Sequence, residues 1–286
     1  MSSNKIFITE DNLYQYVAYL KSEERAATTV EKYIRDIRAL ADFLNGTEIT
    51  KEAAILWKDK LKATHEATSV NSMITAVNGF FTFLGLDIKV KLLKIQRKTF
   101  LSSAKELTRH EYERLLDAAK SKNNERLYYV MQTICSTGIR VSELRFITVE
   151  AVRNGQAEVT NKNKTRTVFI PSNLKTVLLR YAKQNGIITG VIFVTKNGKS
   201  IDRSNIWLDM KKLCESANVE PSKVYPHNLR HLFARTFYAK EKDIMKLADS
   251  LGHSDVNTTR IYVMGTGAEH RRIIESLGLV KLKYAT

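Results

Sequence analysis

The stretch from Pro226 to Tyr262 reads PHNLRHLFARTFYAKEKDIMKLADSLGHSDVNTTRIY and carries more candidate chemistry than any other part of the chain. His227 and Arg230 are three residues apart, so they share one side of a helix that is predicted to start at the proline. A Leu-Gly pair ends the next helix, His253 follows it, and the tyrosine comes nine residues later. These four candidate residues therefore lie in one short run.

A second arginine, Arg140, lies upstream in TGIRVSEL, where Gly138 lets the chain turn. Glu143 lies about one helical turn further on and can hold the arginine in place. Arginine forks match the geometry of a phosphodiester and stay charged at any working pH. Taken singly, each of these residues could equally belong to a surface ion pair or a packed aromatic. The order and spacing of the whole set carry the interpretation.

A β-hairpin is predicted where strands 156–160 and 165–170 flank the polar run NKNK. A basic hairpin tip can present an ammonium group to a leaving oxygen. Lys162 is our candidate for that role, with Lys164 and Arg166 as close competitors. The alternative is a charged turn that keeps the strand edges from pairing with other chains.

The first 88 residues are predicted to form a helical domain. Thr28 and Glu31 form a predicted capping box. Amphipathic helices that follow one another can bury their apolar stripes only against each other, as a bundle. Helices are expected over residues 11–21, 28–44, 51–63 and 70–84.

Residues 89–105 are basic, contain no acid, and read as an interdomain linker. They form either a solvated tether or a strap along a phosphate backbone.

Residues 106–286 form the second domain, which opens with a capping box of Thr108 and Glu111 and is mostly helical around the hairpin. The expected fold is mainly α with a small β-hairpin (α+β). The basic residues predicted to bind DNA are Lys89, Lys91, Lys94, Arg97, Lys98, Lys164 and Arg166.

The formal net charge of +16 makes a polyanion the expected partner, because its counterions are released on binding. The basic residues are spread along the chain instead of lying on one amphipathic helix, which favours DNA over a membrane surface. A basic protein whose charge serves only solubility is the plain alternative.

No secretory signal or spanning segment is seen, so a cytoplasmic, nucleoid-associated protein is expected. Cys135 and Cys214 lie far apart, which predicts neither disulfides nor a metal site, and no cofactor is expected.

Three boxes, TGIRVSEL, PHNLRHLFA and LGHSDVNTTRIY, resemble in order and spacing the signature of the tyrosine recombinase (phage-type integrase) family. The resemblance implies that two arginines clamp the scissile phosphate and a lysine acts as general acid. It also implies that the first histidine assists as acid or base and that the second binds the phosphate. The tyrosine would form a 3′-phosphotyrosyl bond without metal or ATP. The implied catalytic set is Arg140, Lys162, His227, Arg230, His253 and Tyr262.

The same resemblance implies a Xer-like two-domain recombinase whose helical first domain closes a clamp around DNA. Its partner would be double-stranded DNA with paired recombination half-sites. A monomer would assemble to a homotetramer on two such sites, and accessory DNA-bending or directionality proteins are compatible with this. The tail from 269 to 280 is predicted to pack into a neighbouring subunit, with packing on its own domain as the alternative. Its apolar residues in helical register are Ile273, Ile274, Leu277 and Leu279.

Several functions compete at this point. Integration and excision of a mobile element is the favoured role, and Xer-like resolution of chromosome or plasmid dimers is the alternative. A type IB topoisomerase would act as a monomer on any DNA, and the apolar tail and helical first domain favour a recombinase. A DNA-binding protein without chemistry would have lost a catalytic residue, whereas all six are present.

Relatives place the hairpin lysine in a Gly-Lys-Gly turn. Asn161 and Asn163 replace those glycines in a shorter loop, so the choice of lysine stays open.

Overall fold

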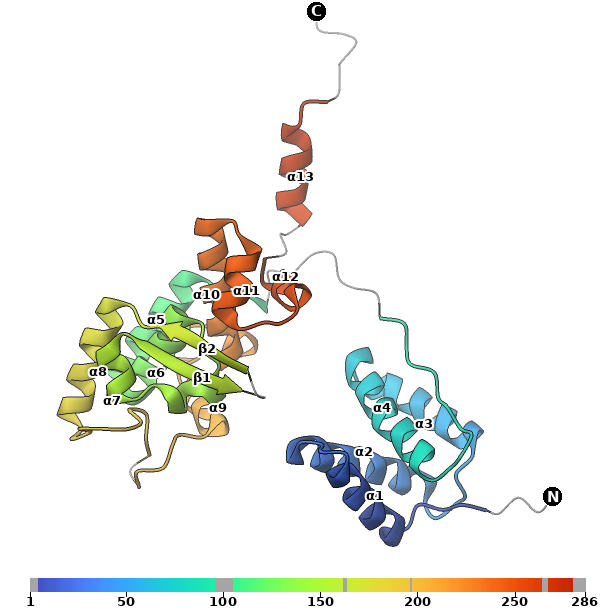
Figure 1. Ribbon diagram of the computed structural model, residues 1–286. Coiled ribbons are helices and arrows are strands. Elements are labelled where there is room, and N and C mark those ends of the chain that lie inside the picture. The colour runs from blue at the N-terminus through green and yellow to red at the C-terminus, as the bar shows by residue number, and fades with distance from the viewer. Residues whose placement is uncertain (1–4, 96–104, 162–163, 196, 264–266, 280–286) are drawn as a thin grey trace, which may run out of the picture. The chain divides into compact units, whose positions relative to one another are not determined.

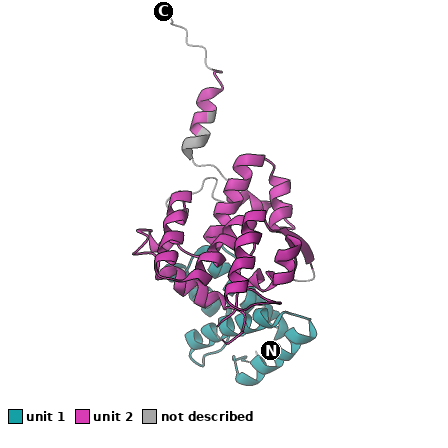
Figure 2. Ribbon diagram, turned by 90° about the vertical axis from the view of Figure 1, so that its left-hand side faces the viewer, with its two compact units in different colours: residues 1–97 teal, residues 98–286 magenta. Residues whose placement is uncertain are grey.

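The structure is a computed structural model of the chain. It describes residues 5–95, 105–161, 164–195, 197–263 and 267–279. The chain divides into two compact units, residues 1–97 and residues 98–286, which are coloured teal and magenta in Figure 2. No helix within the described ranges is both long and apolar enough to cross a membrane.

Unit 1 is a four-helix cluster, made of α1 (Glu10–Ser22), α2 (Ala27–Leu44), α3 (Lys51–Thr64) and α4 (Ala67–Phe83) (Figure 1). Its core includes Ile37, Leu40 and Phe80, none of which is exposed. Helix α2 begins directly after Ala26, and no side chain caps it. The predicted capping box at Thr28 is therefore wrong, because that residue already lies inside the first turn.

The segment predicted as the start of a linker is held by unit 1. The Asn78 side chain exchanges two 2.9 Å hydrogen bonds with the backbone of Val90. Asn71 does the same with the backbone of Leu93, at 2.9 and 2.7 Å. Both asparagines belong to α4, so the chain is fastened along this helix as far as residue 93.

Unit 2 is mostly helical and contains one two-stranded sheet (Figure 1). The predicted capping box at Thr108 and Glu111 is confirmed. The mainly α fold with a small hairpin is confirmed as well. The elements are α5 (Arg109–Ser121), α6 (Glu125–Thr137), η2 (Val141–Phe146), α7 (Val149–Asn154), β1 (Gln156–Asn161), β2 (Lys164–Phe169), α8 (Ser172–Gln184), α9 (Arg203–Lys211), η3 (Pro221–Lys223), α10 (Pro226–Glu241), α11 (Ile244–Leu251), α12 (Val256–Val263) and α13 (Gly267–Ser276).

The hairpin strands are longer at the tip than the sequence predicts. They pair antiparallel from Gln156 with Phe169 to Asn161 with Lys164, which leaves residues 162 and 163 as the connection. Lys164 therefore starts strand β2 instead of lying in the loop. Because strand side chains alternate between faces, this placement decides which way Lys164 and Arg166 point.

Two glycines bring the signature boxes together. Gly138 ends α6 with a φ of +65°, and a Cβ built on it would lie 2.5 Å from the Phe233 ring of α10. Gly252 ends α11 with a φ of +64°, and its Cβ would lie 2.4 Å from the Arg166 side chain of β2. Only glycine tolerates both the left-handed backbone and the close approach. The three boxes and the hairpin thus meet at one place.

Candidate active site

Arg230 on α10 lies at the centre of the candidate site. It is the largest fully buried side chain among the described residues, with 1% of its surface exposed. Its Nη1 donates to the carbonyl oxygen of Gly138, and its Nη2 donates to that of Leu251 at 2.6 Å. Burial lowers the pKa of Arg230 to about 10, with a further contribution from the Arg140 charge, so the group stays protonated at neutral pH. No described carboxylate pairs with it, so its charge is available to an anion.

Arg140 is the second arginine and comes directly before η2. Its Nη1 donates to Glu143 Oε1 at 2.9 Å, and its backbone N–H donates to Glu143 Oε2 at 2.9 Å. The Arg140 side chain is 32% exposed, whereas that of Glu143 is 2% exposed. Glu143 therefore holds the Arg140 guanidinium, as predicted, and about a third of the Arg140 side chain remains exposed.

Arg166 is turned inward from β2. Its Nη1 and Nη2 donate to the two oxygens of Glu143 at 3.0 and 2.9 Å, and the side chain is 13% exposed. Burial would raise the pKa of Glu143, but the hydrogen bonds from Arg166 and from the Arg140 backbone lower it to about 2. Contact of Arg166 with DNA stays a prediction, since its observed partners lie within the protein.

Tyr262 on α12 packs among three histidines. Its side chain is buried, with 3% of the residue exposed, and its hydroxyl lies 3.3 Å from Nε2 of His227. Burial lowers the pKa of His227, and the charges of Arg230 and Arg140 lower it further. A neutral His227 can accept the phenol proton. The His231 ring lies 4.3 Å from the Tyr262 ring, closer than the His227 ring at 5.8 Å.

His253 follows Gly252 between α11 and α12. Its Nε2 lies 3.0 Å from Nη2 of Arg230, and its Nδ1 lies 2.8 Å from the hydroxyl oxygen of Thr259. Burial lowers its pKa to about 4, with contributions from Arg230 and Arg140. The ring stacks on Tyr262 with centroids 5.6 Å apart.

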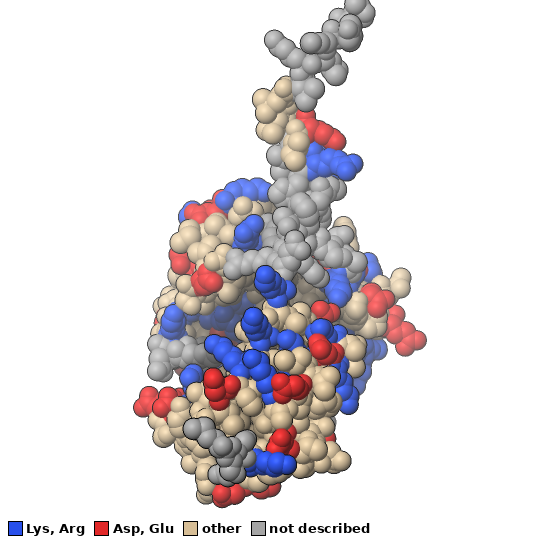
Figure 3. All heavy atoms as spheres, turned by 90° about the vertical axis from the view of Figure 1, so that its right-hand side faces the viewer, with Lys and Arg blue, Asp and Glu red and all other residues tan. Residues whose placement is uncertain are grey.

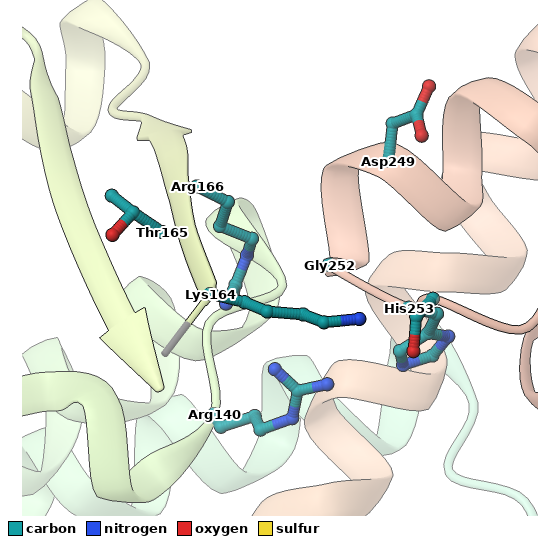
Figure 4. A pocket seen from close by; sticks show the side chains of 8 residues that line it. Arg140, Lys164, Thr165, Arg166, Asp249, Gly252 and His253 are labelled. Carbon is teal, nitrogen blue, oxygen red and sulfur yellow. The ribbon is translucent and has the colours of Figure 1, made fainter. Parts of the chain in front are cut away.

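Lys164 completes a cavity of about 550 Å³ whose lining includes Arg140, Arg166 and His253. In Figure 4 the Lys164 side chain extends from β2 and ends between Arg140 and His253. Lys162 lies outside the described residues. Within those residues, no group of three His, Cys, Asp or Glu side chains is arranged to hold a metal ion.

As far as the structure describes them, the predicted DNA-binding lysines of the linker belong to unit 1. Lys89, Lys91 and Lys94 are exposed on unit 1, whereas Arg97 and Lys98 lie outside the described residues. Exposed lysine and arginine side chains are numerous on the face of the chain drawn in Figure 3.

Sequence reasoning overlooked two neighbours of the predicted set. His231 directly follows Arg230, but it also lies four residues after His227, so the two histidines share one face of α10 and His231 contacts the Tyr262 ring. Thr259 carries no motif of its own; its position three residues before Tyr262 on one helix was the only available signal.

His253 contacts Arg230, and His227 contacts Tyr262. Arg140 lines two cavities, one together with His253 and the other together with His227 and Arg230. These are the side-chain types that phosphoryl transfer to a tyrosine would use. Residues 105–267 match the sequence model of the phage integrase family, and residues 13–86 match that of the phage integrase N-terminal SAM-like domain. The first match covers more than half of the chain. The chain therefore belongs to the phage integrase family of tyrosine recombinases, enzymes that cleave and rejoin DNA.

The chain resembles several named recombinases along most of its length. It is 28% identical to the tyrosine recombinase XerA of Pyrococcus furiosus over 279 residues, which make up 94% of each protein. It is 28% identical to the tyrosine recombinase XerC of Roseiflexus castenholzii over 87% of this chain and 88% of that one.

Two solved structures are also similar to the chain along most of its length. The crystal structure of XerA recombinase matches with a TM-score of 0.53 and 26% identity, over 96% of this chain and all of that one. A lambda integrase tetramer bound to a Holliday junction matches with a TM-score of 0.74, over 91% of this chain and 78% of that one. At 18% identity, the second likeness shows the fold alone.

Proposed function

We propose that the chain cleaves DNA by attack of Tyr262 on a phosphodiester and leaves a 3′-phosphotyrosyl intermediate. The observation that carries this proposal is the phenol hydroxyl 3.3 Å from Nε2 of His227, beside the buried charge of Arg230. The tyrosine oxygen bonds to phosphorus while its proton passes to His227. The bond from phosphorus to the 5′ oxygen breaks. Because one phosphodiester replaces another, a 5′ hydroxyl can reverse the step without ATP.

The two arginines supply the charge stabilisation. The transition state gathers negative charge on the nonbridging oxygens of the phosphate, where fixed cationic donors are most effective. Arg230 is held by two backbone carbonyls and Arg140 by Glu143, so neither must be reorganised during the reaction. The Nε–H of Arg230 is buried and has no acceptor among the described residues, and a bound anion would supply one.

The proton for the leaving 5′ oxygen comes from a hairpin lysine. The family resemblance points to Lys162, and the lining of the cavity points to Lys164. A substrate whose 5′ oxygen is replaced by sulfur separates the two, because a thiolate leaves without needing a proton. Each lysine is changed to alanine, and the true acid is the one whose variant regains cleavage on the sulfur substrate. If sulfur rescues neither variant, both assignments are wrong.

Double-stranded DNA is the proposed substrate, bound as paired half-sites. Three apolar residues of the C-terminal segment, Ile274, Leu277 and Leu279, are 66%, 56% and 85% exposed. Their exposure supports exchange of this segment with a neighbouring subunit in a homotetramer. Light scattering with and without a two-site duplex tests the assembly, and a monomer on that duplex would contradict it.

Two biological roles remain candidates. Integration and excision of a mobile element is the first. Resolution of chromosome or plasmid dimers is the second, and it is favoured by the likeness to XerA over 94% of both chains. A plasmid that carries two direct copies of the target site distinguishes the two roles. Resolution by this chain alone supports the second role, and dependence on an element-encoded directionality protein supports the first.

The first experiment compares the wild type with Tyr262→Phe on nicked suicide duplexes drawn from the DNA that flanks the gene. A covalent adduct on the 3′ end of the DNA, present only in the wild type, is expected. An adduct that persists in Tyr262→Phe would place the nucleophile on another residue. No adduct, despite intact DNA binding, would contradict the proposed chemistry on these duplexes.

A further inference from the structure

The hydrogen bonds of His253 reveal which of its nitrogens carries the proton. Arginine can only donate, so the Nε2 that lies 3.0 Å from Nη2 of Arg230 must be the accepting nitrogen. A neutral ring then carries its proton on Nδ1 and donates it to the Thr259 hydroxyl at 2.8 Å. In this state Nε2 offers no proton to a phosphate.

The proposed reaction needs the opposite arrangement. A histidine that binds the scissile phosphate must donate an N–H to a nonbridging oxygen. Nε2 has to gain a proton for this, because Nδ1 is taken by Thr259. The ring then either becomes the Nε2–H tautomer, with a bare Nδ1, or becomes doubly protonated. The partner of Nδ1 must serve all of these states.

Thr259 has the chemistry for this adjustment. A threonine hydroxyl has one proton to donate and two lone pairs that accept, so it can bond Nδ1 whether or not that nitrogen carries a proton. Thr259 is fully buried, and His253 is the partner that its hydroxyl has among the described residues. Neighbouring Thr258 differs, since it is exposed and donates to the backbone of Asp255 at 2.6 Å.

The other charged groups around the ring would not do the same. Those that act on His253 are Arg230 and His227 from α10, Arg140 directly before η2, and Arg166 from β2. The three arginines only donate, and their positive charges oppose a positive ring. An entering phosphate reverses that balance by adding negative charge between Arg230 and Arg140.

We propose that Thr259 is a positioning residue for His253. Its hydroxyl fixes the orientation of the His253 ring through the hydrogen bond to Nδ1. The hydroxyl changes from acceptor to donor when Nε2 of His253 stops accepting from Arg230 and starts donating to the scissile phosphate. This inference rests on the proposed function of the site.

The first test compares Thr259→Val, which removes the hydroxyl at nearly constant shape, with Thr259→Ser, which keeps it. Thr258→Val is the matched control. Single-turnover adduct formation is measured at saturating duplex, together with the affinity for DNA. We expect Thr259→Val to slow adduct formation by about tenfold, the loss of one buried hydrogen bond, with unchanged affinity. The serine and the control variants should stay within about twofold of the wild type.

A second test does not require catalysis. Nitrogen-15 NMR of the histidine rings distinguishes Nδ1–H from Nε2–H, and six histidines are few enough to assign with a His253→Gln variant. The free protein should show Nδ1 of His253 protonated, and orthovanadate, a phosphoryl transition-state mimic, should shift protonation to Nε2. Thr259→Val should weaken this response.

Three results would overturn the proposal. These are a free His253 protonated on Nε2, a Thr259→Val variant with wild-type cleavage, and a serine variant as slow as the valine variant. The last would make Thr259 a packing residue. If the wild type itself forms no adduct, the proposed function fails, and the NMR result still decides the role of Thr259.

Discussion

Replacing Glu143 with glutamine tests the buried charge network that supports the site. Glu143 is 1% exposed and accepts four hydrogen bonds, two from Arg140 and two from Arg166. The pKa of its carboxyl falls from 4.5 to about 2 in the folded protein. At about 1.4 kcal/mol per pH unit, this corresponds to roughly 3 kcal/mol of stability at pH 7. Glutamine removes the charge and turns an N–H donor toward an arginine.

The pH dependence separates this charge effect from a packing effect. Because the folded-state pKa is lowered, the contribution is complete above about pH 5 and is lost as the pH falls toward 2. The free energy of unfolding of Glu143→Gln should therefore lie about 3 kcal/mol below that of the wild type at pH 7. The difference should shrink by roughly 2 kcal/mol at pH 3.

Urea unfolding, followed by fluorescence, measures the effect. The chain has two tryptophans, so a Trp57→Phe background leaves Trp207 as the reporter of unit 2. Glu158→Gln is the control, since Glu158 is exposed and its partner is one hydroxyl. A loss below about 1 kcal/mol at pH 7, or an equal loss at both pH values, would refute the reasoning.

Three further outcomes are expected. Gly138→Ala should lower the melting temperature of unit 2 more than Gly186→Ala, because both glycines have positive φ but only the first has a ring 2.5 Å from the new Cβ. Calorimetry decides this, and equal shifts would contradict the packing argument. Arg230→Lys should slow adduct formation by about a hundredfold, because lysine keeps the charge without the fork, and near-normal rates would remove Arg230 from the clamp. DNA binding should weaken more than tenfold between about 50 and 200 mM salt in filter binding, and a flat response would contradict phosphate contacts.

Much of the fold and of the site follows from short-range signals. The capping box at Thr108, the proline at the start of α10 and the glycine after α11 are written in a few neighbouring residues. The proposed catalytic set follows from the order and spacing of its boxes. The same pattern at Thr28 and Glu31 gave a wrong prediction, because α2 starts without any side-chain cap, so a match to the pattern is not decisive.

The sequence by itself determined the helical class, the hairpin and the residues that belong to the signature. Only the tertiary structure decided that Arg166 faces Glu143, that His253 contacts Arg230 and that Tyr262 lies beside His227. The physical reason is distance along the chain. Caps and turns depend on groups within about one helical turn, whereas these contacts join segments whose approach is set by packing of whole elements. A pairing such as Arg230 with the carbonyls of Gly138 and Leu251 exists only after α6, α10 and α11 have packed.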